Sequence, residues 1–392
     1  MNVDGFKAAA LAAGLRKEDH LDLGLIAADE PVAVAGVFTR NTVQAAPVLW
    51  SRARVAKGRA QAILVNSGQA NACTGPEGME AASQTARAVA QELGCGEDEV
   101  LLASTGVIGE PLNQEAMIRA LPNLKAGLGK DQLPEVARAM MTTDTRPKIV
   151  KSEGKIDGRP FKIVGLAKGA GMIAPNMATL LSFILTDAVI QAKPLQDVLG
   201  PAVEATFNRI TVDGDTSTND TVLILASGRA GFKPLTPEEP ANWKVFEQAL
   251  RHVLADLARL LITDAEGATR LVHVIVSGAA DDTQAREAAM TVANSPLVKT
   301  ALFGQDANWG RIMAALGRSR AAFDPEQVSI LFDQALLVRQ GRLAGDEAKA
   351  AQVMRQDEFS ISIDLGAGSG QAEVLTCDMS YDYVRLNADY RS

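Results

Sequence analysis

A threonine at position 179 stands where a stiff loop meets a continuous apolar run. The loop, residues 168–178, contains two glycines, which permit backbone angles that other residues avoid, and Pro175, which fixes its own φ. Residues 179–186 are apolar and β-branched, which predicts a strand buried on both faces. Thr179 is therefore expected at the point where a constrained turn enters a buried strand.

Two interpretations of Thr179 follow from these residues. In the first, it is only a β-branched residue that opens a strand. In the second, its hydroxyl attacks the carbonyl of Ala178, water hydrolyses the resulting ester, and Thr179 becomes a new N-terminus. The freed α-amine, with a pKa of ~7.7–8, then takes the hydroxyl proton, so that Thr179 acts as a nucleophile without a histidine.

Thr105 and Gly106 are candidates for the oxyanion site that such chemistry requires. They follow a predicted strand at 99–103, and a Thr-Gly pair at a strand end can present a hydroxyl and a backbone N–H to one point. Thr-Gly turns are also common, so an ordinary turn remains open. The polar run at 142–145 follows an apolar helical pattern, and forms either a helix C-cap or a cluster facing a site.

The elements that must position these residues alternate between strand and helix patterns. Strand patterns occur at 31–38, 60–65, 99–103, 148–152, 161–166, 179–186, 221–226 and 270–277. Helical patterns occur at 79–93, 113–120, 133–141, 192–207, 246–262 and 282–294, and we expect strands to end the chain. The small polar segment 66–75 is either a ligand-contacting loop or a capped turn. The pattern predicts a mixed α/β protein with at least two lobes.

Charge and cysteine content argue against several classes of protein. The chain has 39 Lys and Arg against 47 Asp and Glu, a net charge of -8, which disfavours non-specific nucleic-acid binding. Its three cysteines are far apart and form no CxxC, so neither a disulfide framework nor a zinc site is indicated. No run reaches the ~20 apolar residues of a spanning helix, and the N-terminus lacks the features of a signal peptide. We expect a cytoplasmic protein without a membrane partner.

Two other segments resemble ligand motifs only superficially. The stretch that begins at Asp213 lacks the glycine of a calcium loop at its sixth position, and has Ile224 instead of Glu at its twelfth. Residues 163–171 lack the GK[ST] of a phosphate loop. The first segment is more simply a polar turn entering the strand at 221–226.

Eight stretches in order along the chain resemble the glutamate N-acetyltransferases, also called ornithine acetyltransferases. They are NSGQANACTG (66–75), STGVIG (104–109), MTTDTRPK (141–148), KGAGMIAPNMATLL (168–181), DGDTSTND (213–220), DAEGAT (264–269), DANWGR (306–311) and YVRLNADYRS (383–392). One such motif would be a weak sign. Eight in order, in a resemblance that extends from Gly36 to Ser392, are specific.

The resemblance implies a fold and a set of site residues. The fold would be the four-layer α/β/β/α arrangement of proteins like the N-terminal-nucleophile enzymes. Self-cleavage between Ala178 and Thr179 would give an α chain (1–178) and a β chain (179–392), which fold together as one α/β unit with a smaller second lobe in the C-terminal part. Thr179 would carry the acetyl group, and Thr105 and Gly106 would form the oxyanion hole. The implied substrate-binding residues are Thr142, Lys168, Thr179, Glu266, Asn387 and Ser392.

The resemblance also implies a reaction and an assembly. N2-acetylornithine would donate acetyl to the threonine, ornithine would leave, and glutamate would accept the group. No cofactor or metal is implied, acetyl-CoA is left open as a second donor, and two α and two β chains would assemble. We hypothesise that Lys168 holds the α-carboxylate of both amino acids and that Glu266 pairs with the ammonium of ornithine. The alternatives are a surface lysine and a turn acid.

Two other functions compete with this one. A related N-terminal-nucleophile amidohydrolase or aminopeptidase would use the same threonine but pass the acyl group to water. An unprocessed, non-catalytic binding protein would never expose it. Lys168, Glu266 and the tail at 387–392 favour amino-acid acceptors, and therefore a transferase.

Overall fold

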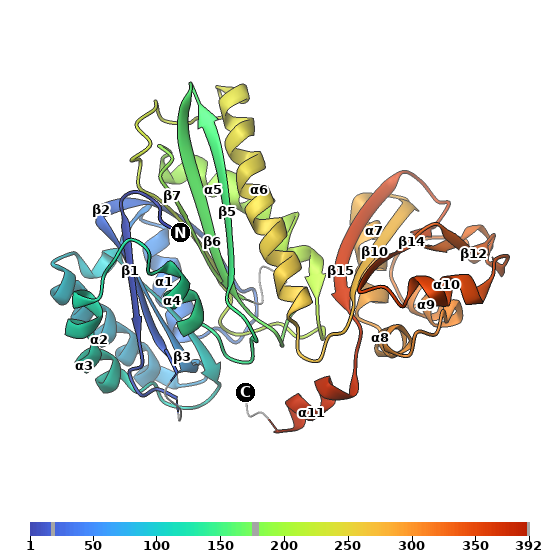
Figure 1. Ribbon diagram of the computed structural model, residues 1–392, viewed down its shortest axis with the longest axis horizontal. Coiled ribbons are helices and arrows are strands. Elements are labelled where there is room, and N and C mark those ends of the chain that lie inside the picture. Colours follow the sequence, from blue (N-terminus) through green and yellow to red (C-terminus); the bar gives the residue numbers. More distant parts are fainter. Residues whose placement is uncertain (17–19, 175–179, 390–392) are drawn as a thin grey trace. The chain divides into compact units, whose positions relative to one another are not determined.

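The computed structural model describes residues 1–16, 20–174 and 180–389, and it divides into two compact units (Figure 1). Unit 1 comprises Met1–Asn208 and Asp215–Leu261, and unit 2 comprises Arg209–Gly214 and Ile262–Arg391. Each unit is built on one mixed β-sheet. The predicted mixed α/β class is confirmed by these two sheets.

Unit 1 contains an eight-stranded sheet in the order β4-β3-β2-β9-β7-β6-β5, with β1 paired to β2. Its strands are β1 (Phe6–Leu11), β2 (Leu23–Phe38), β3 (Arg59–Gln69), β4 (Val100–Val107), β5 (Lys148–Ile156), β6 (Arg159–Lys168), β7 (Leu181–Thr186) and β9 (Thr221–Ala226). The pairs β3–β4 and β7–β9 are parallel, and the other pairs of this sheet are antiparallel.

Strands β7 and β9 are buried along their whole length, and most of their side chains on both faces are apolar. This confirms the prediction of a fully buried strand just after position 179. In the sheet, β7 lies between β6 and β9, and β9 pairs with β2. Strands that precede residue 175 in the sequence therefore share one hydrogen-bonded sheet with strands that follow residue 179.

Helices cover both faces of this sheet, and α2 and α3 lie side by side on one of them (Figure 1). Residues of β3 alternate between two apolar clusters: Ile63 and Val65 pack in one with Val136 of α4, and Leu64 packs in the other with Val89 of α2. The helices that begin in unit 1 are α1 (Ala46–Val55), α2 (Gly75–Leu93), α3 (Gln114–Ala126), α4 (Leu133–Ala139), α5 (Ala192–Glu204) and α6 (Pro240–Thr263).

Unit 2 contains a seven-stranded sheet in the order β13-β12-β11-β14-β10-β15-β8. Its strands are β8 (Ile210–Thr211), β10 (Leu271–Ala279), β11 (Ser329–Phe332), β12 (Ala335–Arg339), β13 (Arg342–Leu343), β14 (Glu358–Asp364) and β15 (Gly370–Cys377). Its helices are α7 (Asp282–Ala293), α8 (Pro296–Phe303), α9 (Trp309–Gly317), α10 (Glu347–Val353) and α11 (Tyr381–Asp389). Alternate valines of β10 form its core with the alanines of α7.

Two expectations about the elements differ from the structure, and some elements were not expected. The chain does not end in strands, because α11 follows β15. Residues 66–69 are not a loop, because they continue β3 and pair with β4. Strand β1 and helix α1 were not predicted. Within the ranges that the structure describes, no helix is both long and apolar enough to cross a bilayer.

Candidate active site

Lys168 is the last residue of β6 and stands at the end of the central strands. It pairs with Leu181 of β7, which in turn pairs with Thr221 of β9. The predicted nucleophile Thr179 and its neighbour Ala178 lie outside the described residues, and the description resumes at Leu180. The register places Lys168 beside the strand that follows the predicted cleavage point.

The ammonium group of Lys168 joins two other predicted site residues. Its Nζ donates hydrogen bonds to the hydroxyl oxygen of Thr142, at 2.8 Å, and to that of Thr105, at 3.1 Å. Lys168 is 8% exposed, so the alternative of a surface lysine is wrong. Because Thr105 accepts a hydrogen bond from Lys168, its own proton can be donated elsewhere, as an oxyanion site requires.

A buried carboxylate, Asp144, binds the backbone next to this cluster. It accepts hydrogen bonds from Lys148 Nζ at 2.6 Å, from the Gly169 N–H at 2.7 Å and from the Thr142 N–H at 3.1 Å. Burial raises the pKa of Asp144, but the ammonium groups of Lys168 and Lys148 and these hydrogen bonds outweigh burial, so the pKa lies below its usual value. Thr142 and Asp144 of the run 142–145 therefore belong to a polar cluster around Lys168, whereas the C-cap of α4 is Met140.

Gly106 is held where only glycine fits. Its φ is +129°, and a Cβ there would lie 2.3 Å from the carbonyl carbon and oxygen of Gly68 on the neighbouring strand. The parallel register of β3 and β4 sets Gly68 beside Gly106 and Ser67 beside Thr105. Ser104 is buried, whereas Thr105 and Gly106 are half-exposed, so β4 brings the Thr-Gly pair to the surface of the unit.

Two further predicted substrate-binding residues meet in unit 2. Asn387, on α11, donates from its side-chain amide to Glu266 Oε2 at 2.8 Å. The start of α11 is held by Ser380, whose hydroxyl donates to the carbonyl of Gly267 at 2.6 Å. Ser392 lies outside the described residues. The structure thus brings together Thr105, Thr142 and Lys168 in one unit, and Glu266 and Asn387 in the other.

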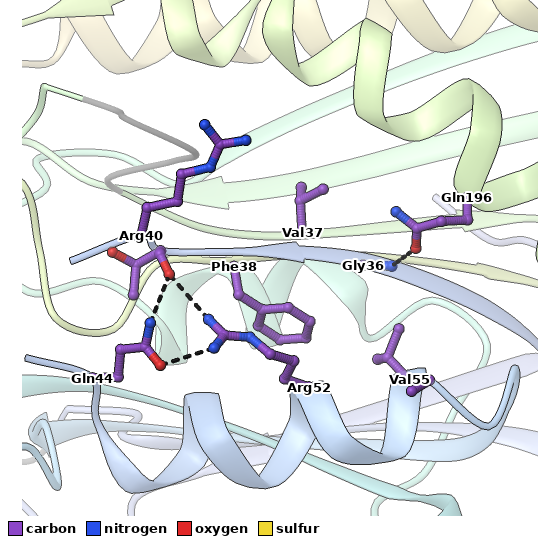
Figure 2. Close-up of a pocket in the computed structure, with 10 residues that line it drawn as sticks. Gly36, Val37, Phe38, Arg40, Gln44, Arg52, Val55 and Gln196 are labelled. Carbon is purple, nitrogen blue, oxygen red and sulfur yellow. Dashed lines mark hydrogen bonds between the residues drawn. The ribbon is translucent and has the colours of Figure 1, made fainter. Parts of the chain in front are cut away.

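A groove of about 640 Å³ opens at the end of β2. Gln44, which lies just before α1, and Arg52 of α1 both donate to the carbonyl of Thr39, at 3.3 and 3.0 Å. Figure 2 shows the side chains of Gln44 and Arg52 side by side, where Arg52 Nη1 donates to Gln44 Oε1 at 2.8 Å. The Thr39 hydroxyl in turn donates to the carbonyl of Ser217 at 2.8 Å. The groove was not predicted, since its residues are not contiguous in the sequence. Through the contact of Thr39 with Ser217, the end of β2 also holds the segment 213–220 in place.

On a mixed α/β scaffold, the site presents a Thr-Gly pair and a buried lysine beside the start of one strand, an arrangement that fits acyl-transfer chemistry. The ArgJ family model matches residues 7–392, and the chain belongs to the ArgJ family. The predicted family is confirmed.

Known relatives cover the whole chain. A protein of Syntrophotalea carbinolica is 51% identical over 397 residues, and one of Geobacter sulfurreducens is 50% identical over 394 residues, each with 100% of both chains covered. Both are called arginine biosynthesis bifunctional protein ArgJ. The crystal structure of the protein of that name from Bacillus halodurans is 44% identical, with a TM-score of 0.51, and covers 53% of this chain and 98% of its own.

Proposed function

We propose that this protein is an acetyltransferase of arginine biosynthesis, which moves an acetyl group from N2-acetylornithine to glutamate through an acetyl-Thr179 intermediate. The observation that carries the proposal is the buried ammonium of Lys168 between the hydroxyls of Thr105 and Thr142, in a member of the ArgJ family. The relatives' name, a bifunctional protein of arginine biosynthesis, supports the pathway. A second donor such as acetyl-CoA fits the word bifunctional.

We propose that the chain first cuts itself between Ala178 and Thr179. The Thr179 hydroxyl attacks the Ala178 carbonyl carbon, the peptide C–N bond breaks, and water hydrolyses the ester that forms. This leaves a carboxylate on Ala178 and a free α-amine on Thr179. The Thr105 hydroxyl and the Gly106 N–H would stabilise the oxyanion in both steps.

One observation concerns how the sheet would span a cut at this position, and a second supports the cut itself. The α chain (1–178) and the β chain (179–392) would both contribute strands to one sheet, because β7 and β9 are flanked by β6 and β2. The β chain would be 214 of 392 residues, or 55%, close to the 53% of this chain that the Bacillus halodurans chain covers. A chain of that length is what a processed relative would contain.

In the transfer reaction, the α-amine of Thr179 takes the hydroxyl proton while the oxygen attacks the acetyl carbonyl carbon. The C–N bond of N2-acetylornithine breaks, and ornithine leaves with a proton on its amine. The amine of glutamate then attacks the acetyl-threonine ester and restores the free hydroxyl. We assign substrate binding to Thr142, Lys168, Glu266, Asn387 and Ser392, with Lys168 facing a carboxylate and Glu266 the ammonium of ornithine.

The first test is a denaturing gel with intact mass on freshly expressed protein. From the mass of 41.3 kDa, residues 1–178 account for about 18.8 kDa and residues 179–392 for about 22.5 kDa. The cleaved protein should transfer acetyl from N2-acetylornithine to glutamate, and Thr179→Ala should stay intact and inactive. A single full-length band identical to that of Thr179→Ala rejects self-cleavage, and acetate released at an equal rate without glutamate indicates a hydrolase instead.

We also propose that two α and two β chains assemble in the cytoplasm, with no cofactor. Size-exclusion chromatography with light scattering should give about twice 41.3 kDa for the processed protein. A mass of one αβ unit would reject the tetramer without affecting the proposed reaction.

A further inference from the structure

The segment 213–220, which fails as a calcium loop, ends in two buried polar residues. Asn219 is 6% exposed and Asp220 is 2% exposed, and both come directly before β9. Neither belongs to the oxyanion pair or to the substrate-binding set. Because burying polar side chains costs free energy, their hydrogen bonds indicate what the segment holds in place.

Asn219 holds the peptide that precedes the oxyanion pair. Its Nδ2 donates to the carbonyl of Ser104 at 2.8 Å and to the carbonyl of Ala70 at 2.6 Å. Its Oδ1 accepts from the hydroxyl of Thr218 at 2.6 Å, which fixes the orientation of the amide. The Ser104 carbonyl and the Thr105 N–H belong to one planar peptide unit, so this contact orients the start of the pair.

Asp220 and Thr221 bind the backbone of Leu180, the residue that follows the proposed nucleophile. The Leu180 N–H donates to the Asp220 carboxyl group, and the Thr221 N–H donates to the Leu180 carbonyl at 3.0 Å. Both backbone groups of Leu180 are therefore bound by two consecutive residues. The nitrogen of Leu180 is in the peptide bond with Thr179, so the anchored residue is the one attached to the nucleophile.

We propose that Asn219 and Asp220 together fix the spacing between the oxyanion hole and the nucleophile, and that both are positioning residues. Adjacent Cα atoms are about 3.8 Å apart, so one short buried dipeptide holds the residue before the hole and the residue after the nucleophile. A misplacement of about 1 Å can cost about 100-fold in rate. The inference rests on the proposed function, in which Thr179 and the Thr105–Gly106 pair react together.

A substitution of Asn219 gives the clearest test of this proposal. Asn219→Asp keeps the shape but offers at most one proton where the amide offers two. We expect the rate of self-cleavage and the kcat of acetyl transfer to fall by the same factor, about 100-fold, with each KM within twofold of wild type. The factors should match because both reactions use one nucleophile and one oxyanion hole.

Two further variants keep the test independent of folding. Thr218→Val removes only the hydroxyl that orients the Asn219 amide, and should give a smaller but again parallel loss in the two rates. Asp220→Asn should stay within about threefold of wild type, since an amide oxygen still accepts from Leu180, whereas Asp220→Leu should lose both reactions. Burial raises the pKa of the Asp220 carboxyl well above its usual value, and Asn keeps the shape of this side chain in its buried position.

Asn113→Ala is the matched control. It removes an asparagine that caps α3 in the same unit, so it should lower the melting temperature slightly with both rates unchanged. Wild-type rates in Asn219→Asp and Thr218→Val, a change confined to KM, or unequal losses in the two reactions would overturn the positioning role while the proposed function stands. A wild-type protein that neither cleaves nor transfers rejects the proposed function and this inference with it.

Discussion

Lys168 carries a charge that the fold takes almost entirely out of water. Its Nζ donates to the hydroxyls of Thr142 and Thr105, and its positive charge lowers the pKa of Asp144 and favours an anionic group of a substrate nearby. A charged hydrogen bond of this kind contributes about 1.5–3 kcal/mol, which corresponds to about 10- to 100-fold in binding. The first prediction follows from that magnitude.

Lys168→Met should raise the KM for N2-acetylornithine and for glutamate by about 10- to 100-fold, because both carry an α-carboxylate. Steady-state kinetics on protein that has already cleaved measures this. Lys151→Met, at an exposed position on β5, is the control and should leave both constants unchanged. An unchanged KM for both substrates in Lys168→Met would reject the role.

Gly106→Ala should block self-cleavage, because the added Cβ would meet the carbonyl of Gly68 at 2.3 Å and displace the strand end. The protein should run as a single band on a denaturing gel. Gly109 separates crowding from backbone strain: its φ is also positive, at +84°, but a Cβ there meets nothing within 4 Å. Gly109→Ala should still cleave, and cleavage in Gly106→Ala at the rate of Gly109→Ala would contradict the prediction.

At this scale, sequence motifs could name Thr105, Gly106, Thr142 and Lys168 but not the residues behind them. The contacts of Asn219 join segments that are far apart in the chain, such as Asn219 to Ser104, across 115 residues. The spacing of residues along one sequence does not reveal hydrogen bonds between segments that only the fold brings together. The positioning residues were therefore found only once the strands had been paired.

At the scale of elements, the ion pair of Asp144 and Lys148 joins the polar run after α4 to the start of β5. Both side chains are fully buried, at 0% exposure. Asp144→Ala should lower the free energy of unfolding by about 3–5 kcal/mol, because it removes the carboxylate that faces a buried ammonium. Urea denaturation measures this, with Glu153→Ala at the exposed Lys151 pair as a control that should change little. A loss no larger than that of the control would contradict the prediction.

The same pair predicts a pH dependence. The pKa of Asp144 is lower in the folded state than its usual value of about 3.9, so its stabilising contribution is present above that pH and is lost as the pH falls below it. Asp144→Asn should flatten the acid limb of a plot of unfolding free energy against pH. Parallel acid limbs in wild type and Asp144→Asn would show that another group controls it.

Elements with a strong local signal were predictable, and those without one were not. An Asp-Gly pair between two strand patterns favours a hairpin, and Asp157 and Gly158 both have positive φ in the turn between β5 and β6. Helix α11 was missed because its short segment was interpreted as part of the closing strands, and none of its residues is buried. Strand β1 was missed because its run of alanines shows no alternation between apolar and polar residues.

At the scale of the whole molecule, the predicted cut does not divide the fold. We expect the two fragments to co-elute in native size-exclusion chromatography, because β7 and β9 are hydrogen-bonded between β6 and β2. They should separate only in denaturant. Fragments that elute apart from freshly cleaved protein under native conditions would contradict this arrangement of the sheet.

If the chain is cut at the predicted position, the place of β7 within the sheet also changes how the protein refolds. An intact chain refolds as a single molecule, at a rate independent of its concentration. Once cut, the same sheet must be rebuilt from two molecules that find each other, so refolding becomes second order and fails on dilution. Maturation would then be a one-way step: the precursor can reach its fold alone, whereas the active enzyme, once unfolded, depends on the concentration of its own halves.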